Sequence, residues 1–334
     1  MPATNLPGGA TSYGFPIFPG SLYDVPQGNV WFVNNNRTQA LQASGDGTSR
    51  DKAFVSIADA LAKIATTNPT KGDMIVVGAG HTENVTASNT WSNSLVNTGA
   101  VAIPQGTRIV GEGIGSSRPT ITFTAAGSTI AFASQDCSIE NMVLTAPTGS
   151  VSVTAAITST ASGLIVRNNW FAAITGTASQ FTTSVLLASG SNFAYILDNY
   201  AYAVAGSGAP TNWVATTGTV GPTNVYLQRN TAQLALSATT AGLIDVSSAS
   251  GTAPTNWLIS DNTFVNQIAS ATVCIKGVAG WTGTVCYNNF GGGVTTNMTT
   301  TAINTPASLM SFQNFCTSGG KWAIVGGGAG VQTS

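Results

Sequence analysis

Short hydrophobic stretches separated by Gly, Ser, Thr and Asn follow one another along most of the chain. Within them one phrase recurs, in which two or three apolar positions are followed by a polar residue, an asparagine and an aromatic or apolar residue. It reads SIENMVL, IVRNNWF, YILDNYA, YLQRNTA, LISDNTF, VCYNNFG and MSFQNFC. The asparagines of the phrase lie about 29 residues apart on average, at Asn141, Asn169, Asn199, Asn230, Asn262, Asn289 and Asn314.

A second repeat supports the same alignment. PTNVYLQRNT, which begins at Pro222, and PTNWLISDNT, which begins at Pro254, share Pro, Thr and Asn at matching places. A repeat of this length that holds several short strands and no helix of its own is typical of a β-solenoid, whose coils stack to bury a continuous core. The predicted fold class is all-β, a right-handed single-stranded parallel β-helix. Asparagines at one place in every coil predict a ladder of side-chain amides along its length.

The region before the repeats has a different pattern. NVWFV at residues 29–33 predicts a short strand. Ser56 opens SIADALAKIA, where Ile57, Leu61 and Ile64 recur at helical spacing and Asp59 follows the cap by three residues. This helix is expected to cap the N-terminal end of the solenoid, which would otherwise expose unpaired strand edges. MIVV at residues 74–77 predicts the first strand of the coils.

The two ends of the chain complete the predicted organisation. Residues 1–28 contain five of the 13 prolines and are expected to form an extended attachment arm that docks through Tyr13, Phe15, Ile17 and Phe18; a disordered terminus is the alternative. Residues 29–73 hold the strand, a turn and the capping helix, and residues 74–318 hold the β-helix. Residues 319–334 form a Gly-rich tail with a short strand at 322–325, which either caps the last coil or exchanges between subunits.

Charge is scarce in this sequence. Charged residues make up 7% of the chain, with 11 basic and 12 acidic side chains, against roughly 25% in an average soluble domain. The thinly spread Lys and Arg exclude the basic cluster that a nucleic-acid partner requires. The first residues lack the basic and apolar regions of a signal peptide, and no run of 18 apolar residues predicts a membrane span.

The cysteines and the single histidine predict neither a metal site nor a cofactor site. Cys137, Cys274, Cys286 and Cys316 show no CxxC spacing, and His81 is the only histidine. Free thiols buried in the core are favoured, and disulfides are the alternative. His81 lies two residues before Glu83, so that in a strand both would share one face and form a structural hydrogen bond.

The candidate chemistry lies in the column of residues that precede the repeat asparagines. They are Glu140, Asn168, Asp198, Arg229, Asp261, Asn288 and Gln313. Asp198 and Asp261 would lie two coils apart, about 9.6 Å from the strand spacing, near the upper limit for the carboxyls of an inverting glycosidase. Alternatively, Arg229 between them forms an Asp-Arg-Asp ion ladder, and this alternative is favoured because its charge would hold both carboxylates ionised.

Aromatic residues offer a second kind of candidate site. Trp170, Trp213, Trp257 and Trp281 could stack on sugar rings if they are exposed. For Trp257, which lies inside a repeat strand, a place in the core or in a subunit contact is favoured.

Four segments near the start of the chain resemble a known protein family. GDGTSRDKAFVSIADALAKI, GDMIVVGAGHTENV, RIVGEGIGSSRPTITF and CSIENMVL are similar to the opening coils of pectate-lyase-like parallel β-helix proteins, especially those of tailed bacteriophages. The resemblance covers residues 28–145 by motif and continues to about residue 316 by repeat. It implies a homotrimer built into the particle. For activity the resemblance is not specific, because this fold hosts lyases, glycosidases, adhesins and non-catalytic virion proteins.

The resemblance and the scarcity of carboxylates favour a non-enzymatic virion protein. We expect a capsid decoration (cement) protein or a head spike or fibre, assembled in the host cytoplasm, whose arm contacts the major capsid protein or another virion protein. The alternative is a tailspike-type receptor-binding protein or depolymerase that acts on bacterial surface polysaccharide. A secreted plant-wall lyase is disfavoured by the missing signal peptide and the few calcium-type carboxylates.

Overall fold

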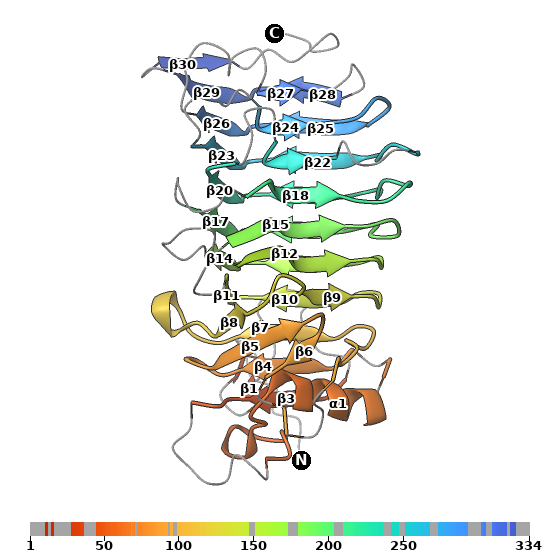
Figure 1. Cartoon of the computed structure of the whole chain (residues 1–334), viewed down its shortest axis with the longest axis vertical. Coiled ribbons are helices and arrows are strands. Elements are labelled where there is room, and N and C mark those ends of the chain that lie inside the picture. Colours follow the sequence, from red (N-terminus) through yellow and green to blue (C-terminus); the bar gives the residue numbers. More distant parts are fainter. Residues whose placement is uncertain are drawn as a thin grey trace.

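The chain folds into a stack of β-coils that forms a parallel β-helix (Figure 1). The structure is a computed structural model, and it describes residues 11–12, 15–16, 28–36, 45–67, 69–70, 72–92, 94–95, 99–146, 151–172, 180–203, 210–236, 242–246, 251–267, 273–292, 302–304, 309–318 and 321–324. Each full coil contributes one strand to each of three sheets, which run along the stack. The predicted fold class is therefore confirmed.

Sheet 1 has ten strands, all parallel to their neighbours. In chain order they are β3 (Val30–Val33), β4 (Met74–Val77), β7 (Arg108–Gly111), β10 (Ser138–Glu140), β13 (Ile165–Arg167), β16 (Tyr195–Leu197), β19 (Tyr226–Gln228), β22 (Trp257–Ser260), β25 (Gly283–Cys286) and β28 (Leu309–Phe312). The predicted strands at 29–33 and 74–77 correspond to β3 and β4.

Sheet 2 has eleven strands and an antiparallel strand at each end. Its strands are β5 (Thr82–Ala87), β6 (Thr90–Trp91), β8 (Thr120–Phe123), β11 (Val143–Thr145), β14 (Trp170–Ala172), β17 (Tyr200–Tyr202), β20 (Thr231–Leu234), β23 (Thr263–Asn266), β26 (Asn289–Gly292), β29 (Phe315–Ser318) and β30 (Lys321–Ile324). The terminal strands β6 and β30 each pair with a neighbour from the same end of the chain, so hairpins close both ends of this sheet.

Sheet 3 has seven strands. They are β9 (Ile130–Phe132), β12 (Ser152–Ser159), β15 (Gln180–Leu187), β18 (Asn212–Thr216), β21 (Ile244–Asp245), β24 (Ile275–Lys276) and β27 (Ile303–Asn304). Their lengths range from two to eight residues, whereas every strand of sheet 1 has three or four residues. Variation in coil length is therefore accommodated away from sheet 1.

Inward-facing side chains of the three sheets form one continuous core. Along sheet 1 the middle residues of successive strands, such as Ile139, Val166 and Ile196, lie in register and are fully buried. Their strand neighbours point outward, as the alternation of a pleated strand requires. Burying one such side chain contributes roughly 1.5–3 kcal/mol, so the stacked rows supply the main stabilisation of the coils.

The predicted capping helix is α1 (Ile57–Thr67), which lies at the N-terminal end of the stack (Figure 1). Its buried face, with Ile57, Leu61 and Ile64, joins the core cluster that contains Ile75 of β4. This apolar face covers the open end of the first coil, so the end of the core is shielded from water.

A buried polar network fastens α1 to the first coil. The Glu83 carboxylate accepts hydrogen bonds from Ser56 Oγ at 2.6 Å and from the backbone N–H of Ile57 at 2.9 Å. His81 Nε2 lies 3.1 Å from the same carboxylate, and His81 Nδ1 accepts from the backbone N–H of Asn35. The imidazole proton therefore sits on Nε2 and is donated to Glu83. The predicted structural bond between His81 and Glu83 is confirmed.

The arm and the tail are described only in part. In the first 28 residues, β1 (Thr11–Ser12) pairs antiparallel with β2 (Phe15–Pro16). Tyr13, Ile17 and Phe18 of the predicted attachment arm lie outside the described residues, as does the side chain of Phe15. Near the other end, β30 falls within one residue of the strand predicted at 322–325 and pairs antiparallel with β29.

Replacing Glu83 by Gln tests the polar network. The amide keeps one acceptor and loses the charge that faces the N-terminus of α1, so we expect the free energy of unfolding to fall by about 1–3 kcal/mol in chemical denaturation. Glu112→Gln is the matched control, because Glu112 pairs with Arg50 at a partly exposed site and its loss should cost under about 1 kcal/mol. Equal losses in both variants would contradict the anchoring role of Glu83.

Candidate functional site

A ladder of buried asparagines runs through the corner between sheets 1 and 2. From Asn199 onward, each Oδ1 accepts from the backbone N–H and the side-chain amide of the asparagine one coil earlier, at 2.9–3.2 Å for Asn169 to Asn199. Each Nδ2 also donates to a carbonyl of an earlier sheet 1 strand, as Asn199 does to Val166 at 2.9 Å. The members are Asn169, Asn199, Asn230, Asn262, Asn288 and Asn314. The predicted ladder therefore exists.

Two predicted members, Asn141 and Asn289, are wrong. Asn141 has a φ of 58° and turns outward, where its amide donates to the carbonyls of Gly111 and Gly113. Met142 takes the inward place, and its backbone N–H donates to Asn169. In the YNNF segment Asn288 is the rung, and Asn289 begins β26.

The number of residues between an asparagine and the next sheet 2 strand distinguishes a ladder rung from an asparagine beside it in the sequence. Every rung lies two places before a buried sheet 2 residue, such as Phe171 after Asn169 or Phe290 after Asn288. Counting back from these apolar positions identifies Asn288 in the sequence alone. Aligning on the second asparagine of NNF places the rung one residue late.

The residue immediately before each rung, and before Met142 in the first of these corners, forms an outer column. These residues adopt the left-handed conformation, with φ between 50° and 59°, which allows the chain to turn from sheet 1 into sheet 2. They are Asn141, Asn168, Asp198, Arg229, Asp261, Tyr287 and Gln313. The predicted column was wrong at two places: Glu140 belongs to β10 and Asn288 belongs to the ladder.

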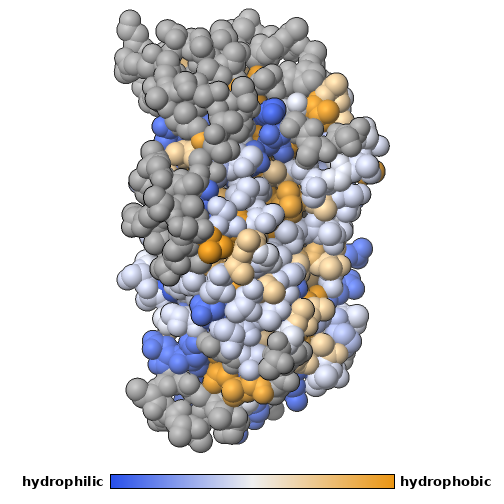
Figure 2. Space-filling model, viewed as in Figure 1, coloured by the Kyte–Doolittle hydropathy of each residue, from blue (hydrophilic) through white to orange (hydrophobic). Residues whose placement is uncertain are grey.

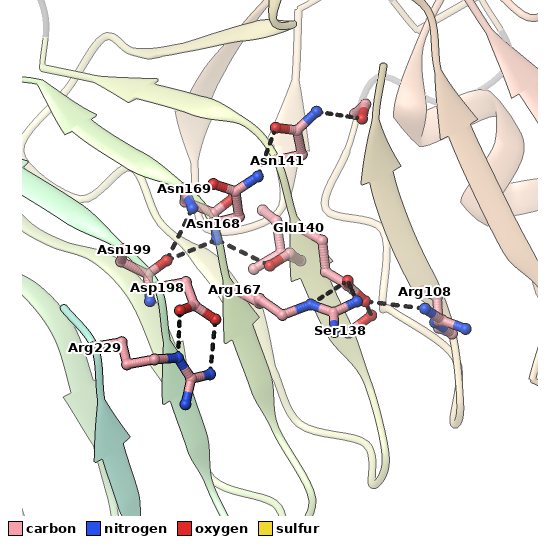
Figure 3. A network of polar contacts seen from close by, with 12 residues as sticks. Arg108, Ser138, Glu140, Asn141, Arg167, Asn168, Asn169, Asp198, Asn199 and Arg229 are labelled. Atoms are coloured by element: carbon pink, nitrogen blue, oxygen red, sulfur yellow. Dashed lines mark hydrogen bonds and ion pairs between the residues drawn. The ribbon is translucent and has the colours of Figure 1, made fainter. Parts of the chain in front are cut away.

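Within this outer column, Arg229 binds Asp198. Its Nε and one terminal nitrogen donate to the two carboxylate oxygens at 2.7 and 3.0 Å (Figure 3). The hydrogen bond with Asp198 raises the pKa of Arg229, and the negative charge of Asp261 acts in the same direction. The Asp198–Arg229 part of the predicted ion ladder is therefore present, and Asp261 acts on Arg229 through its charge.

A second ion network lies on the outer face of sheet 1, at Glu140. Arg167 donates to one oxygen of Glu140 through Nε at 2.9 Å, and Arg108 lies 3.2 Å from the other oxygen (Figure 3). Ser138 completes the site with a hydrogen bond of 2.9 Å. Glu140 is 5% exposed, so the arginines and the hydroxyl compensate for its burial. Sequence reasoning missed this network, because Arg108 lies outside the recurring phrase and the column alignment moved Glu140 to a turn.

The four candidate sugar-stacking tryptophans separate into two groups. Trp213, Trp257 and Trp281 are fully buried, and Trp257 donates to the carbonyl of Pro222 at 2.9 Å. Trp170 is 37% exposed and lies in register with the exposed Tyr200 of the next coil, with ring centroids 6.2 Å apart. Trp170 is therefore the member of the set that can contact a ligand.

All four cysteines are free and buried, as the sequence predicted. Burial raises the pKa of Cys137 to about 11 and that of Cys274 to about 12. Burial and the nearby charge of Asp261 also raise the pKa of Cys286. In the part of the chain that the structure describes, no three His, Cys, Asp or Glu side chains are grouped so that they could hold a metal ion.

One face of the molecule can be described by its hydropathy. Figure 2 shows a face of mostly intermediate hydropathy, over which hydrophilic and hydrophobic residues are scattered. None of the helices in the described ranges is long and apolar enough to cross a membrane.

Comparison with models of protein families, with curated proteins and with solved structures finds no match for this chain.

The adjacent asparagines of the YNNF segment test the ladder. Asn288→Ala removes hydrogen bonds to Asn262, Asn314 and Ile259 and leaves the buried N–H of Asn262 unpaired. We expect the free energy of unfolding to fall by about 3 kcal/mol, measured by chemical denaturation. Asn289→Ala should cost less than about 1 kcal/mol, and the reverse order of the two effects would show that the ladder is assigned wrongly.

Thiol labelling tests the burial of the cysteines. Because burial raises their pKa values, Cys137 and Cys274 remain protonated thiols at pH 8 and should react with iodoacetamide only after unfolding. Peptide mapping should find Cys286 labelled first in the native protein, since it follows the fully buried Val285 in β25 and its side chain therefore points to the outer side of the strand. Rapid labelling of Cys274 at pH 8 would contradict this packing.

Proposed function

We propose that this chain is a non-enzymatic structural protein of a bacteriophage particle, a homotrimer that serves as a capsid decoration protein or as a head spike or fibre. Its partners are then other copies of itself and the major capsid protein or another virion protein. The attachment arm of residues 1–28 is the segment proposed to contact the capsid. No cofactor is part of this proposal.

The pairing of acidic side chains on the outside of the coils carries the proposal. Glu140 is bound by Arg108 and Arg167, Asp198 is bound on both oxygens by Arg229, and Lys276 lies 3.7 Å from Asp245. A glycosidase needs one carboxyl as an acid and a second as a base or nucleophile. A lyase of this fold needs carboxylates that hold calcium. Carboxylates that are occupied by basic side chains suit neither task.

The fold and the low charge support the same proposal. A parallel β-helix is compatible with the phage-type, pectate-lyase-like proteins that the opening segments resemble, although fold alone does not determine function. Charged residues make up 7% of the chain, and a surface with few charges and many small polar residues can pack closely against identical neighbours, because few charges must lose their hydration.

One observation favours a second candidate, a tailspike-type receptor-binding protein or depolymerase. Trp170 and Tyr200 form an exposed aromatic pair next to the outer column residues Asn168 and Asp198. Aromatic faces stack on the apolar sides of sugar rings, and amide and carboxylate groups bind sugar hydroxyls. In this candidate function the chain binds bacterial surface polysaccharide at this place.

Digestion of bacterial surface polysaccharide separates the two functions. We expect the purified protein to release no oligosaccharide, as measured by chromatography of the digest, and Asp198→Asn and Asp261→Asn to leave this result unchanged. Cleavage by the wild type that is lost in either variant would overturn the structural role and establish a depolymerase.

A further inference from the structure

An apolar stripe follows the outer face of sheet 1 along the axis of the coils. Its rungs lie in register on six successive strands, from β13 to β28. They are Ile165, Tyr195, Tyr226, Leu258 and Met310, with the small polar Thr284 between the last two. Leu197 and Phe312 flank the stripe on β16 and β28. At about 4.8 Å per strand the stripe extends roughly 24 Å in a straight line.

The stripe is ordered, partly exposed along most of its length and most exposed at the last coil. The rings of Tyr195 and Tyr226 stack with centroids 4.8 Å apart and planes 5° from parallel. At the last coil, Met310 is 61% exposed and Phe312 is 37% exposed, and Phe312 also contacts the exposed ring of Tyr287. Contiguous apolar surface of this kind on a soluble protein marks an interaction site.

The chain itself covers the same face at its N-terminal end. Phe32, Met74 and Val76 also point outward from sheet 1, but they form a small buried cluster with Ala53. Arg50 lies over the Phe32 ring at 5.3 Å and pairs with Glu112, which holds this covering segment in place. The described residues place no corresponding segment over the stripe.

The Glu140 network separates the covered part of the face from the stripe. Glu140, Arg108 and Arg167 satisfy one another within this chain, so the polar boundary needs no partner. The apolar rungs begin beyond it, with Ile165. A partner would therefore dock on the stripe and leave the ion network intact.

We infer that the stripe is the surface through which copies of this chain associate side by side and parallel, around an axis that runs along the stripe. This inference rests on the homotrimer of the proposed function and specifies the contact. A straight line of side chains with a regular rise is complementary to a partner with the same rise. A second copy provides this partner by symmetry, and an axis along the stripe brings the same rungs of every copy together.

The outer face of sheet 3 is more polar than the stripe and serves as the control surface for substitutions. Its central residues in successive strands are Thr158, Leu186, Ala215, Asp245 and Lys276. The charged pair Asp245 and Lys276 would have to be desolvated in an apolar contact, which disfavours burial of this face. Leu186 on sheet 3 and Leu258 on sheet 1 are both half-buried leucines, so they make matched sites for substitution.

Light scattering of Leu258→Asp and Leu186→Asp tests the inference. We expect wild type and Leu186→Asp to have three times the chain mass of 33.8 kDa, and Leu258→Asp to have the mass of one chain with an unchanged circular dichroism spectrum. If Leu258→Asp is unfolded, cysteine cross-linking tests the contact instead. Oxidised Thr284→Cys should then run as a covalent dimer on a non-reducing gel, and Thr158→Cys on sheet 3 as a monomer.

The outcomes separate this inference from the proposed function. If Leu258→Asp keeps the wild-type mass, the stripe is not the contact between subunits. The same conclusion follows if Thr284→Cys chains form a trimer but do not cross-link. Neither result argues against the trimer itself. A wild type of 33.8 kDa at every concentration would overturn both the contact and the trimer. The polysaccharide digest decides the non-enzymatic role independently of these results.

Discussion

The hydrogen bonds of the buried asparagine ladder are the interaction on which the rest of the structure depends. Where each coil turns from sheet 1 into sheet 2, one residue adopts a left-handed conformation, and the N–H of the rung that follows it has no backbone carbonyl of the next coil as its partner. The turn would leave an N–H and a carbonyl unpaired in the core, at a cost of about 1–3 kcal/mol for each group. The side chain of Asn199, for example, accepts from the N–H of Asn169 and donates to the carbonyl of Val166, which allows the corner to be buried.

The asparagine ladder keeps this corner aligned from coil to coil, although the number of residues per coil varies. Successive rungs are separated by 30, 31, 32, 26 and 26 residues. The extra or missing residues lie elsewhere in the coil, where strands of sheet 3 range from two to eight residues. Because each coil contacts mainly its neighbours, a change of length in one coil need not disturb the others. The side chains on the outer faces are then free to vary, and the ion networks and the apolar stripe lie there.

Much of this architecture could be predicted from the sequence, because periodic patterns report local geometry. The β-helix, the capping helix from Ser56, the first strand at Met74 and the bond between His81 and Glu83 are all confirmed. The predicted ladder was wrong by one residue at Asn141 and Asn289, because an asparagine suits both the left-handed corner and the buried rung. The contacts of Glu140 could not be predicted, because they join residues from three coils whose alignment depends on the irregular coil lengths.

Native-state hydrogen exchange tests the ladder most directly. The backbone N–H groups of Asn169, Asn199, Asn230 and Asn262 donate to the side-chain oxygen of the next rung. Although these residues lie in turns between strands, their amides should exchange as slowly as the strand amides of Val166 and Ile196. Exchange at the rate of exposed turn amides would show that the corner is not held by buried asparagines, and would contradict this account of the fold.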